Sequence, residues 1–397
     1  MIKAVPDGDA DNYRYSDRYY SDLDATHLWD RNLNGNLAEF GGDYCQISLG
    51  ELCWQTYIYG LKLEQDIIVG RIPVYYNSTY AALYDTQALN CILSRTIAFQ
   101  EGTYGTAYRQ KVFLAASMIR LFDTRVDGHC NEYCYESKFD CSLTTQAIYT
   151  DIVQEAGFNA QYRLYDHCNE ADCIEMLPID DDDSDDNCSW DGNTYCSGSS
   201  TEDLNNSTYK ATLYNQSFGV LLQFSHGSPD SSNRRRWICD LPVDNAPQSD
   251  NCQTNCADGE INALPFVYSS DIQGGYGSLS CGRTTRHIHY FGGCNMGKPD
   301  DLGNLAYKML RWRSAASIAS TITGWATNDC KNFDTCMTDY GMQEIRYRWA
   351  DFAIRMNLNI GLALAYATEP IYGRLDMANY NQVLITTLYG DPQMSIY

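Results

Sequence analysis

The chain has 397 residues, and 28 basic against 51 acidic side chains give it a formal net charge of −23. This charge excludes a protein that binds nucleic-acid backbones, which requires a basic face, and no apolar run reaches the roughly 18 residues of a membrane-spanning helix. The 17 cysteines, an odd number, favour an oxidising compartment, and therefore an extracellular, cell-surface or secretory-pathway location.

The first part of the chain predicts little regular structure. Residues 1–44 are polar and rich in Asp, Asn and Tyr, which favours an ordered loop region, and the opening residues lack the apolar core of a signal peptide. Apolar residues at helical spacing then predict an amphipathic helix over 79–99. We expect residues 1–110 to form a smaller N-terminal subdomain.

Predicted strands and helices alternate from residue 111 onward, and residues 111–397 are expected to form a larger, catalytic-type subdomain. The strands are predicted at 111–117, 159–165, 218–225, 264–270, 315–323 and 381–388, and the helices at 143–156, 301–312 and 342–367. This alternation predicts an α/β fold with a mostly parallel sheet flanked by helices. Chemistry in such sheets lies at the carboxyl ends of the strands.

Two segments, 168–217 and 228–262, interrupt this alternation and are expected to be disulfide-rich surface loop insertions. The first contains an acidic run at 180–186, and the second contains the basic triplet at 234–236. Such charge runs are usually solvated, and we favour a salt-linked pair of loops.

Several segments, in this order along the chain, resemble gingipain-type cysteine peptidases. They are SDRYYSDLD (16–24), DIIVGRIPV (66–74), TTQAIYTDIVQEAGFNAQYRLYD (144–166), GVLLQFSHGS (219–228) and TLYGDPQMSIY (387–397). The resemblance implies a caspase-like α/β sandwich and peptide-bond hydrolysis by a Cys-His dyad. It also implies that the N-terminal subdomain is incomplete at its start, because the family has a further strand before the first of these segments.

The resemblance assigns the catalytic base to His226, and it makes the backbone N–H of Gly227 a candidate donor to the oxyanion. In the family the nucleophile ends the strand predicted here at 264–270, and this sequence has no cysteine there. Cys281 is the candidate nucleophile that follows. The chain is then a secreted endopeptidase whose partner is a protein or peptide substrate.

The alternative is that Cys281 forms a disulfide, for example with Cys294. The chain would then be an inactive homologue that contacts neighbouring protein subunits as an extracellular structural or adhesive module. Because the cysteine count is odd, one thiol remains unpaired when all others pair, and Cys91 competes with Cys281 for that place.

Other side chains suggest further sites. Alternating oxygen donors around Gly35 resemble a calcium loop, and similar acidic loops hold calcium in the family, so a structural Ca²⁺ is expected on Asp30, Asn32, Asn34, Asn36 and Glu39. N-glycosylation sequons occur at Asn77, Asn187, Asn205, Asn206 and Asn215.

Three titratable residues are more weakly indicated. His287 and His289 lie two apart, which would put both on one face of a strand, but two ligands are too few for a zinc site and a structural role is favoured. Asp271, at the tip of a predicted strand, lacks the partners that a catalytic acid needs.

Overall fold

A seven-stranded sheet, in the order β14-β13-β12-β8-β3-β6-β7, forms the centre of the computed structural model. The model describes residues 2–4, 14–16, 67–73, 83–122, 137–165, 201–237, 261–272, 286–324, 341–369 and 382–397. All neighbouring strands of this sheet are parallel except β13 and β14, which are antiparallel. The expected α/β sandwich with a mostly parallel sheet is confirmed.

The strands of the sheet are short. They are β3 (Lys111–Ala116), β6 (Asn159–Tyr165), β7 (Thr201–Asp203), β8 (Val220–Phe224), β12 (His287–Gly292), β13 (Ser314–Ser320) and β14 (Thr386–Tyr389). Every residue of β8, β12 and β13 is buried. Such continuous burial is typical of parallel strands that are covered on both faces.

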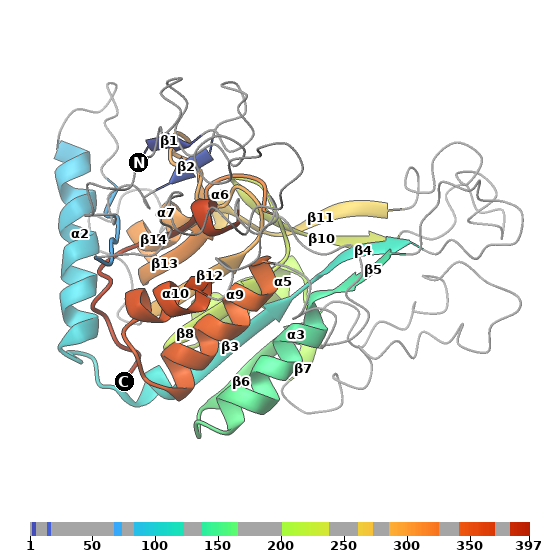
Figure 1. The fold of residues 1–397 in the computed structure, drawn as a ribbon, viewed down its shortest axis with the longest axis horizontal. Coiled ribbons are helices and arrows are strands. Elements are labelled where there is room, and N and C mark those ends of the chain that lie inside the picture. The colour runs from blue at the N-terminus through green and yellow to red at the C-terminus, as the bar shows by residue number, and fades with distance from the viewer. Residues whose placement is uncertain are drawn as a thin grey trace, which may run out of the picture.

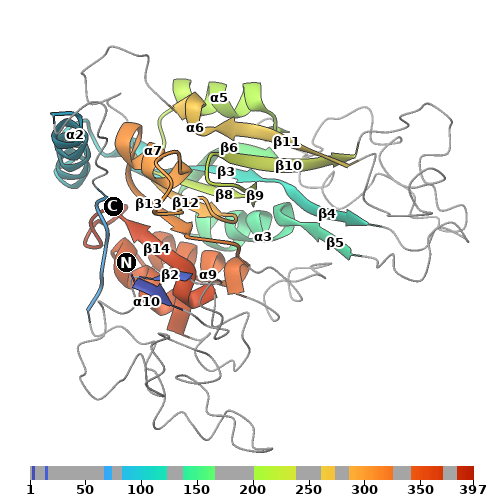
Figure 2. The ribbon, with the colours of Figure 1, turned by 90° about the horizontal axis from the view of Figure 1, so that it is seen from above.

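Helices cover both faces of the sheet (Figure 2). One face carries α5 (Asn206–Asn215) and α7 (Leu305–Trp312), and the other carries α3 (Cys141–Ala147), α9 (Gly341–Ala350) and α10 (Ile360–Thr368). The π-helical segment η4 (Ile148–Gln154) continues α3, and α2 (Leu83–Gln100) packs against α7 and β13. Two apolar clusters result, one on each side of the sheet.

The single long helix predicted over 342–367 is wrong, because the chain turns in the middle. α9 continues as the π-helical segment η6 (Asp351–Arg355), and α10 then begins separately. Asn357 adopts a left-handed conformation, with φ 54°, and the Asn359 side chain caps α10 by accepting from the Leu362 N–H at 2.8 Å. Asparagine suits both roles, so the break has a local cause.

The strand predicted at 264–270 does not belong to the main sheet. It forms β11 (Ile261–Tyr268), which pairs with β10 (Ser231–Trp237) in a separate antiparallel sheet that also holds β9 (His226–Gly227). The expectation that this strand ends beside the catalytic histidine strand is therefore wrong. The neighbour of β8 in that place is β12.

Part of the first expected insertion is also regular structure, because β7 forms the edge of the main sheet and α5 follows it. β10 likewise lies within the second. The remaining elements are small: β1 (Ile2–Ala4), β2 (Arg14–Ser16), β4 (Met118–Phe122), β5 (Ser137–Asp140), η3 (Ala107–Gln110) and α6 (Ser269–Ile272). The β4–β5 and β10–β11 pairs extend together away from the main sheet (Figure 1). Every helix within the described ranges is too short or too polar to cross a bilayer.

Candidate active site

The ends of β8 and β12 bring an imidazole and a thiol to the same edge of the sheet. The two strands are parallel neighbours. β8 is followed by Ser225 and His226, and β12 is followed by Gly293 and Cys294. The Ser225 N–H donates to the Gly292 carbonyl at 3.3 Å, so the two segments stay joined beyond the last residues of β8.

Glycines allow the two strand ends to approach closely. A β-carbon on Gly227 would overlap the carbonyl oxygen of Cys294 and would lie 2.8 Å from Cγ of Met296. A β-carbon on Gly293 would lie 2.7 Å from the Ser225 carbonyl oxygen. Real β-carbons essentially never come within 3.0 Å of such atoms, so only glycine fits at these two positions.

Cys294 carries a free thiol and is partly exposed. Its Sγ donates to the Gly324 carbonyl at 3.6 Å. Burial raises the pKa of the Cys294 thiol above its ordinary value, so the thiol is protonated at neutral pH. A protonated thiol is a poor nucleophile and needs a neighbouring base, and His226 is the titratable side chain at the adjacent strand end.

A buried polar network fixes the segment that carries His226. Tyr209 on α5 donates to Gln223 on β8, and Gln223 donates to Ser232 on β10. The hydroxyls of Ser232 and Ser225 lie 2.6 Å apart. His226 itself pairs with β10 through Asn233. These contacts tie the end of β8 to a second sheet and to a helix.

Cys294 was not singled out from the sequence as a nucleophile, although a signal was present. HIHYFGGC (287–294) has the same pattern as GVLLQFSH (219–226), an apolar run followed by a small residue and then a reactive one. Because the Cys294 thiol is free, the alternative expectation of a Cys281–Cys294 disulfide is wrong. Cys91 is disulfide-bonded, so it is not the residual thiol. Cys141, which is buried, is likewise not in a disulfide.

Many of the residues predicted to form sites lie outside the described part of the chain. They are Cys281, the calcium set Asp30, Asn32, Asn34, Asn36 and Glu39, and the sequon residues Asn77 and Asn187. The structure places His226 and Gly227 as predicted, at a strand end, and leaves their pairing with Cys281 a prediction.

The three remaining sequon residues lie in or next to α5. Asn205 is its N-cap, and its side chain accepts from the Thr208 N–H at 2.9 Å. The Asn206 amide donates to the Phe266 carbonyl at 3.1 Å and to a carboxylate oxygen of Asp271 at 3.2 Å. Asn215 is exposed at the end of the helix.

Asp271 has a structural environment. It forms an ion pair with Lys210 at 2.9 Å and accepts from the Tyr268 N–H at 2.9 Å. Burial acts to raise the pKa of Asp271, but the hydrogen bonds from Lys210, Tyr268 and Asn206 together lower it below its usual value. The carboxylate therefore remains charged and locks α6 against α5 and β11.

His287 and His289 are buried side by side on β12, as the two-residue spacing predicted. Their rings lie 5.8 Å apart, and His289 stacks on Phe291 at 3.6 Å. Burial and then Arg313 lower the pKa of His287 to about 3, and burial and then His287 lower that of His289 well below its usual value. Within the described residues no group of three or more His, Cys, Asp or Glu side chains could hold a metal ion.

In comparisons with known proteins, this chain is similar to solved structures. No protein-family model matches the chain, and no curated protein matches it. It is similar to the crystal structure of the Arg-specific cysteine proteinase gingipain R (RgpB), with a TM-score of 0.48 and 10% identity over 84% of this chain and 56% of that one. It is also similar to the complex of the Porphyromonas gingivalis RgpB pro- and mature domains, with a TM-score of 0.46 and 11% identity over 88% and 62%.

The chain therefore spans less than two thirds of the length of either structure. With TM-scores below 0.5, the similarity says nothing further about function, and the chemistry has to be inferred from the strand ends themselves.

Proposed function

We propose that this chain is a cysteine endopeptidase domain in which Cys294 is the nucleophile and His226 is the general base. The observation that carries the proposal is the adjacency of the two parallel strands β8 and β12, which are followed two residues after their ends by His226 and Cys294. The sequence resemblance to gingipain-type peptidases supports the choice of a peptide bond as the bond that is cut.

The geometry supports a two-step reaction. His226 takes the Cys294 thiol proton as the sulfur attacks the substrate carbonyl carbon, and the protonated imidazole then gives this proton to the leaving amine as the C–N bond breaks. Water hydrolyses the resulting thioester, with His226 as base. The Gly227 N–H, on the turn that contacts Cys294, is the candidate donor to the oxyanion.

The inactive-homologue alternative loses its main support. It was motivated by the absence of a cysteine at the tip of the strand predicted at 264–270. That strand lies in the small antiparallel sheet, and the strand that neighbours β8 is followed by a free thiol.

Matched cysteine variants test the proposal, because Cys281 and Cys294 are the two competing nucleophiles. The full chain is treated with a peptidyl chloromethyl ketone mixture and assayed against a fluorogenic peptide library. We expect Cys294→Ala and His226→Ala to abolish cleavage, with Cys294→Ala also losing the covalent label in intact-mass spectra. Cys281→Ser should keep both. Loss of label and activity in Cys281→Ser, with both retained in Cys294→Ala, would overturn the assignment.

We also propose that the chain is secreted and that residues 30–39 bind a structural Ca²⁺. The cysteine count supports the first, and the alternating oxygen donors support the second. Calcium binding predicts that a chelator lowers the melting temperature and that added Ca²⁺ restores it, whereas Asp30→Ala should be insensitive to both. If chelator and Ca²⁺ changed the melting temperature of Asp30→Ala as much as that of the wild-type chain, the proposed calcium site would be contradicted.

A further inference from the structure

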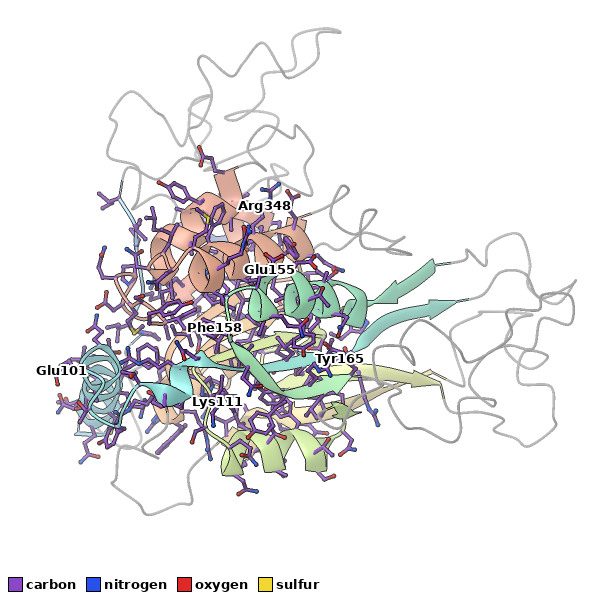
Figure 3. All side chains as sticks on the ribbon, turned by 90° about the horizontal axis from the view of Figure 1, so that it is seen from below. Glu101, Lys111, Glu155, Phe158, Tyr165 and Arg348 are labelled. Atoms are coloured by element: carbon purple, nitrogen blue, oxygen red, sulfur yellow. The ribbon has the colours of Figure 1, made fainter. Side chains whose placement is uncertain are left out.

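Two arginines lie at the amino end of the main sheet, opposite the edge that carries His226 and Cys294. Arg109 lies just before β3, and Arg286 directly precedes β12, the two strands that flank β8. In Figure 3, Lys111 at the start of β3 and Tyr165 at the end of β6 mark the two ends of the sheet, and Glu101 lies on the Lys111 side.

Both guanidinium groups are buried, and both are incompletely paired. Arg109 is 3% exposed and Arg286 is 6% exposed. Within the described chain, Nε and Nη2 of Arg109 and Nε and Nη1 of Arg286 have no hydrogen-bond partner. A buried cation whose N–H groups are unsatisfied is costly, so a bound anion would remove a substantial penalty.

The contacts that these two arginines do make are with aromatic rings, with the main-chain oxygen of Tyr397 and, for Arg109, with the Tyr108 hydroxyl, to which its guanidinium hydrogen-bonds. Arg109 lies over the Phe99 ring at 4.4 Å and donates to the Tyr397 carbonyl at 3.1 Å. Arg286 lies over the Tyr104 ring at 4.5 Å. Neither arginine forms an ion pair with an Asp or Glu side chain of the described residues.

The backbones that carry the two arginines lie near each other at this end of the sheet. The Arg109 backbone contacts Gly219, and the Gly219 carbonyl accepts from the Ile288 N–H at 2.9 Å, so Arg109 and the start of β12 flank the same residue. Adjacent strands are spaced by about 4.8 Å, which puts the two arginines two strand spacings apart. Both lie near Tyr108: burial raises the pKa of this tyrosine, and Arg109 and Arg286 oppose that rise.

Further positive charge lies near Arg286. Burial and then the charges of Arg286 and Arg311 lower the pKa of Arg95 to about 9. Mutual repulsion of this kind is relieved by a multivalent anion that neutralises several cations together.

We propose that Arg109 and Arg286 bind a small multivalent oxyanion of the phosphate class at the amino end of the sheet. Planar guanidinium groups donate paired N–H bonds that match phosphate oxygens. Tyr104, against which Arg286 packs, is 49% exposed, so the site is one aromatic ring away from solvent. The site is separate from the proposed catalytic edge, and its occupancy does not depend on peptidase activity.

Thermal unfolding of the full chain tests this proposal. Sodium pyrophosphate or inorganic phosphate is titrated in a buffer free of other oxyanions, with ionic strength held constant by NaCl. We expect a saturable rise in melting temperature for the wild-type chain. Arg286→Gln should weaken pyrophosphate binding by about tenfold or more. Arg355→Gln is the control, because it removes the same charge from an exposed ion pair with Asp351.

The unliganded variants give a second, independent readout. Because the Arg286 guanidinium has unsatisfied N–H groups, Arg286→Gln should be at least as stable as the wild-type chain without oxyanion. Line broadening of pyrophosphate in ³¹P NMR spectra, lost in Arg286→Gln and kept in Arg355→Gln, would support binding directly. The proposal would be overturned if the melting temperature rose without saturating, and equally, in the wild-type chain, Arg286→Gln and Arg355→Gln. Salts that are excluded from the protein surface stabilise every folded protein in this way.

Discussion

The carbonyl oxygen of Cys294 occupies the space that a β-carbon on Gly227 would need. The strand end that carries the proposed base is thus in direct backbone contact with the strand end that carries the proposed nucleophile. A substitution that moves either strand end should therefore alter the positions of both His226 and Cys294.

Gly227→Ala should impair catalysis and stability together. The added methyl overlaps Cys294 and Met296, so the turn must shift, with an expected cost of about 1–3 kcal/mol in the free energy of unfolding. Urea denaturation and peptide cleavage measure the two effects. Gly105→Ala is the control, because Gly105 has φ 83° but no neighbouring atom within 4 Å of the new methyl. It should lose stability through backbone strain alone and keep its activity.

The reactivity of Cys294 should depend steeply on pH when its base is removed. Because burial raises the pKa of the thiol, the reactive thiolate is scarce at neutral pH, and its fraction grows about tenfold per pH unit until the pKa is reached. In His226→Ala, the rate of alkylation by iodoacetamide should therefore keep rising above pH 8.

The wild-type chain should be alkylated faster than His226→Ala near neutrality, and the two rates should converge at high pH. Intact-mass spectra, corrected with Cys294→Ala, give the rates. Identical pH profiles for the two proteins would show that His226 does not assist the thiol.

Acid should destabilise the fold through His287 and His289. Both are buried as neutral rings with lowered pKa values, so the unfolded chain binds more protons below pH 6.5 and stability falls as the pH falls. For His287 the loss continues towards its folded pKa of about 3. At pH 5 the His287 ring contributes a loss of about 2 kcal/mol.

Urea midpoints between pH 7 and pH 4 measure this loss. His287→Leu, which cannot be protonated, should show a shallower fall than the wild-type chain. If the stability of His287→Leu fell with pH as steeply as that of the wild-type chain, the His287 ring would not be buried as a neutral group.

Ser232→Ala should loosen the attachment of β8 to β10. It leaves the Gln223 amide and the Ser225 hydroxyl without a buried partner, at an expected cost of about 1–3 kcal/mol. Peptide cleavage should fall as well, because His226 follows Ser225 directly. Ser395→Ala is the matched control, since its hydroxyl makes an exposed hydrogen bond to Asn357, away from β8 and β10. Equal effects of the two substitutions would argue against a positioning role for the network.

The sequence by itself determined the local elements and one half of the candidate site. Apolar runs bounded by polar turns located β3, β6 and β8, helical spacing located α2, and the end of the strongest run located His226. These features depend on near neighbours in the chain, so periodicity was sufficient to predict them.

Only the tertiary structure decided which strand lies beside β8. The order of strands in a sheet is set by packing between segments far apart in sequence, and the sequence analysis predicted a strand at 264–270 but none at 287–292, the segment that forms β12. Pairing with β10 draws the first into a separate sheet. The second, buried between β8 and β13, brings Cys294 to His226, a proximity that no local pattern contains.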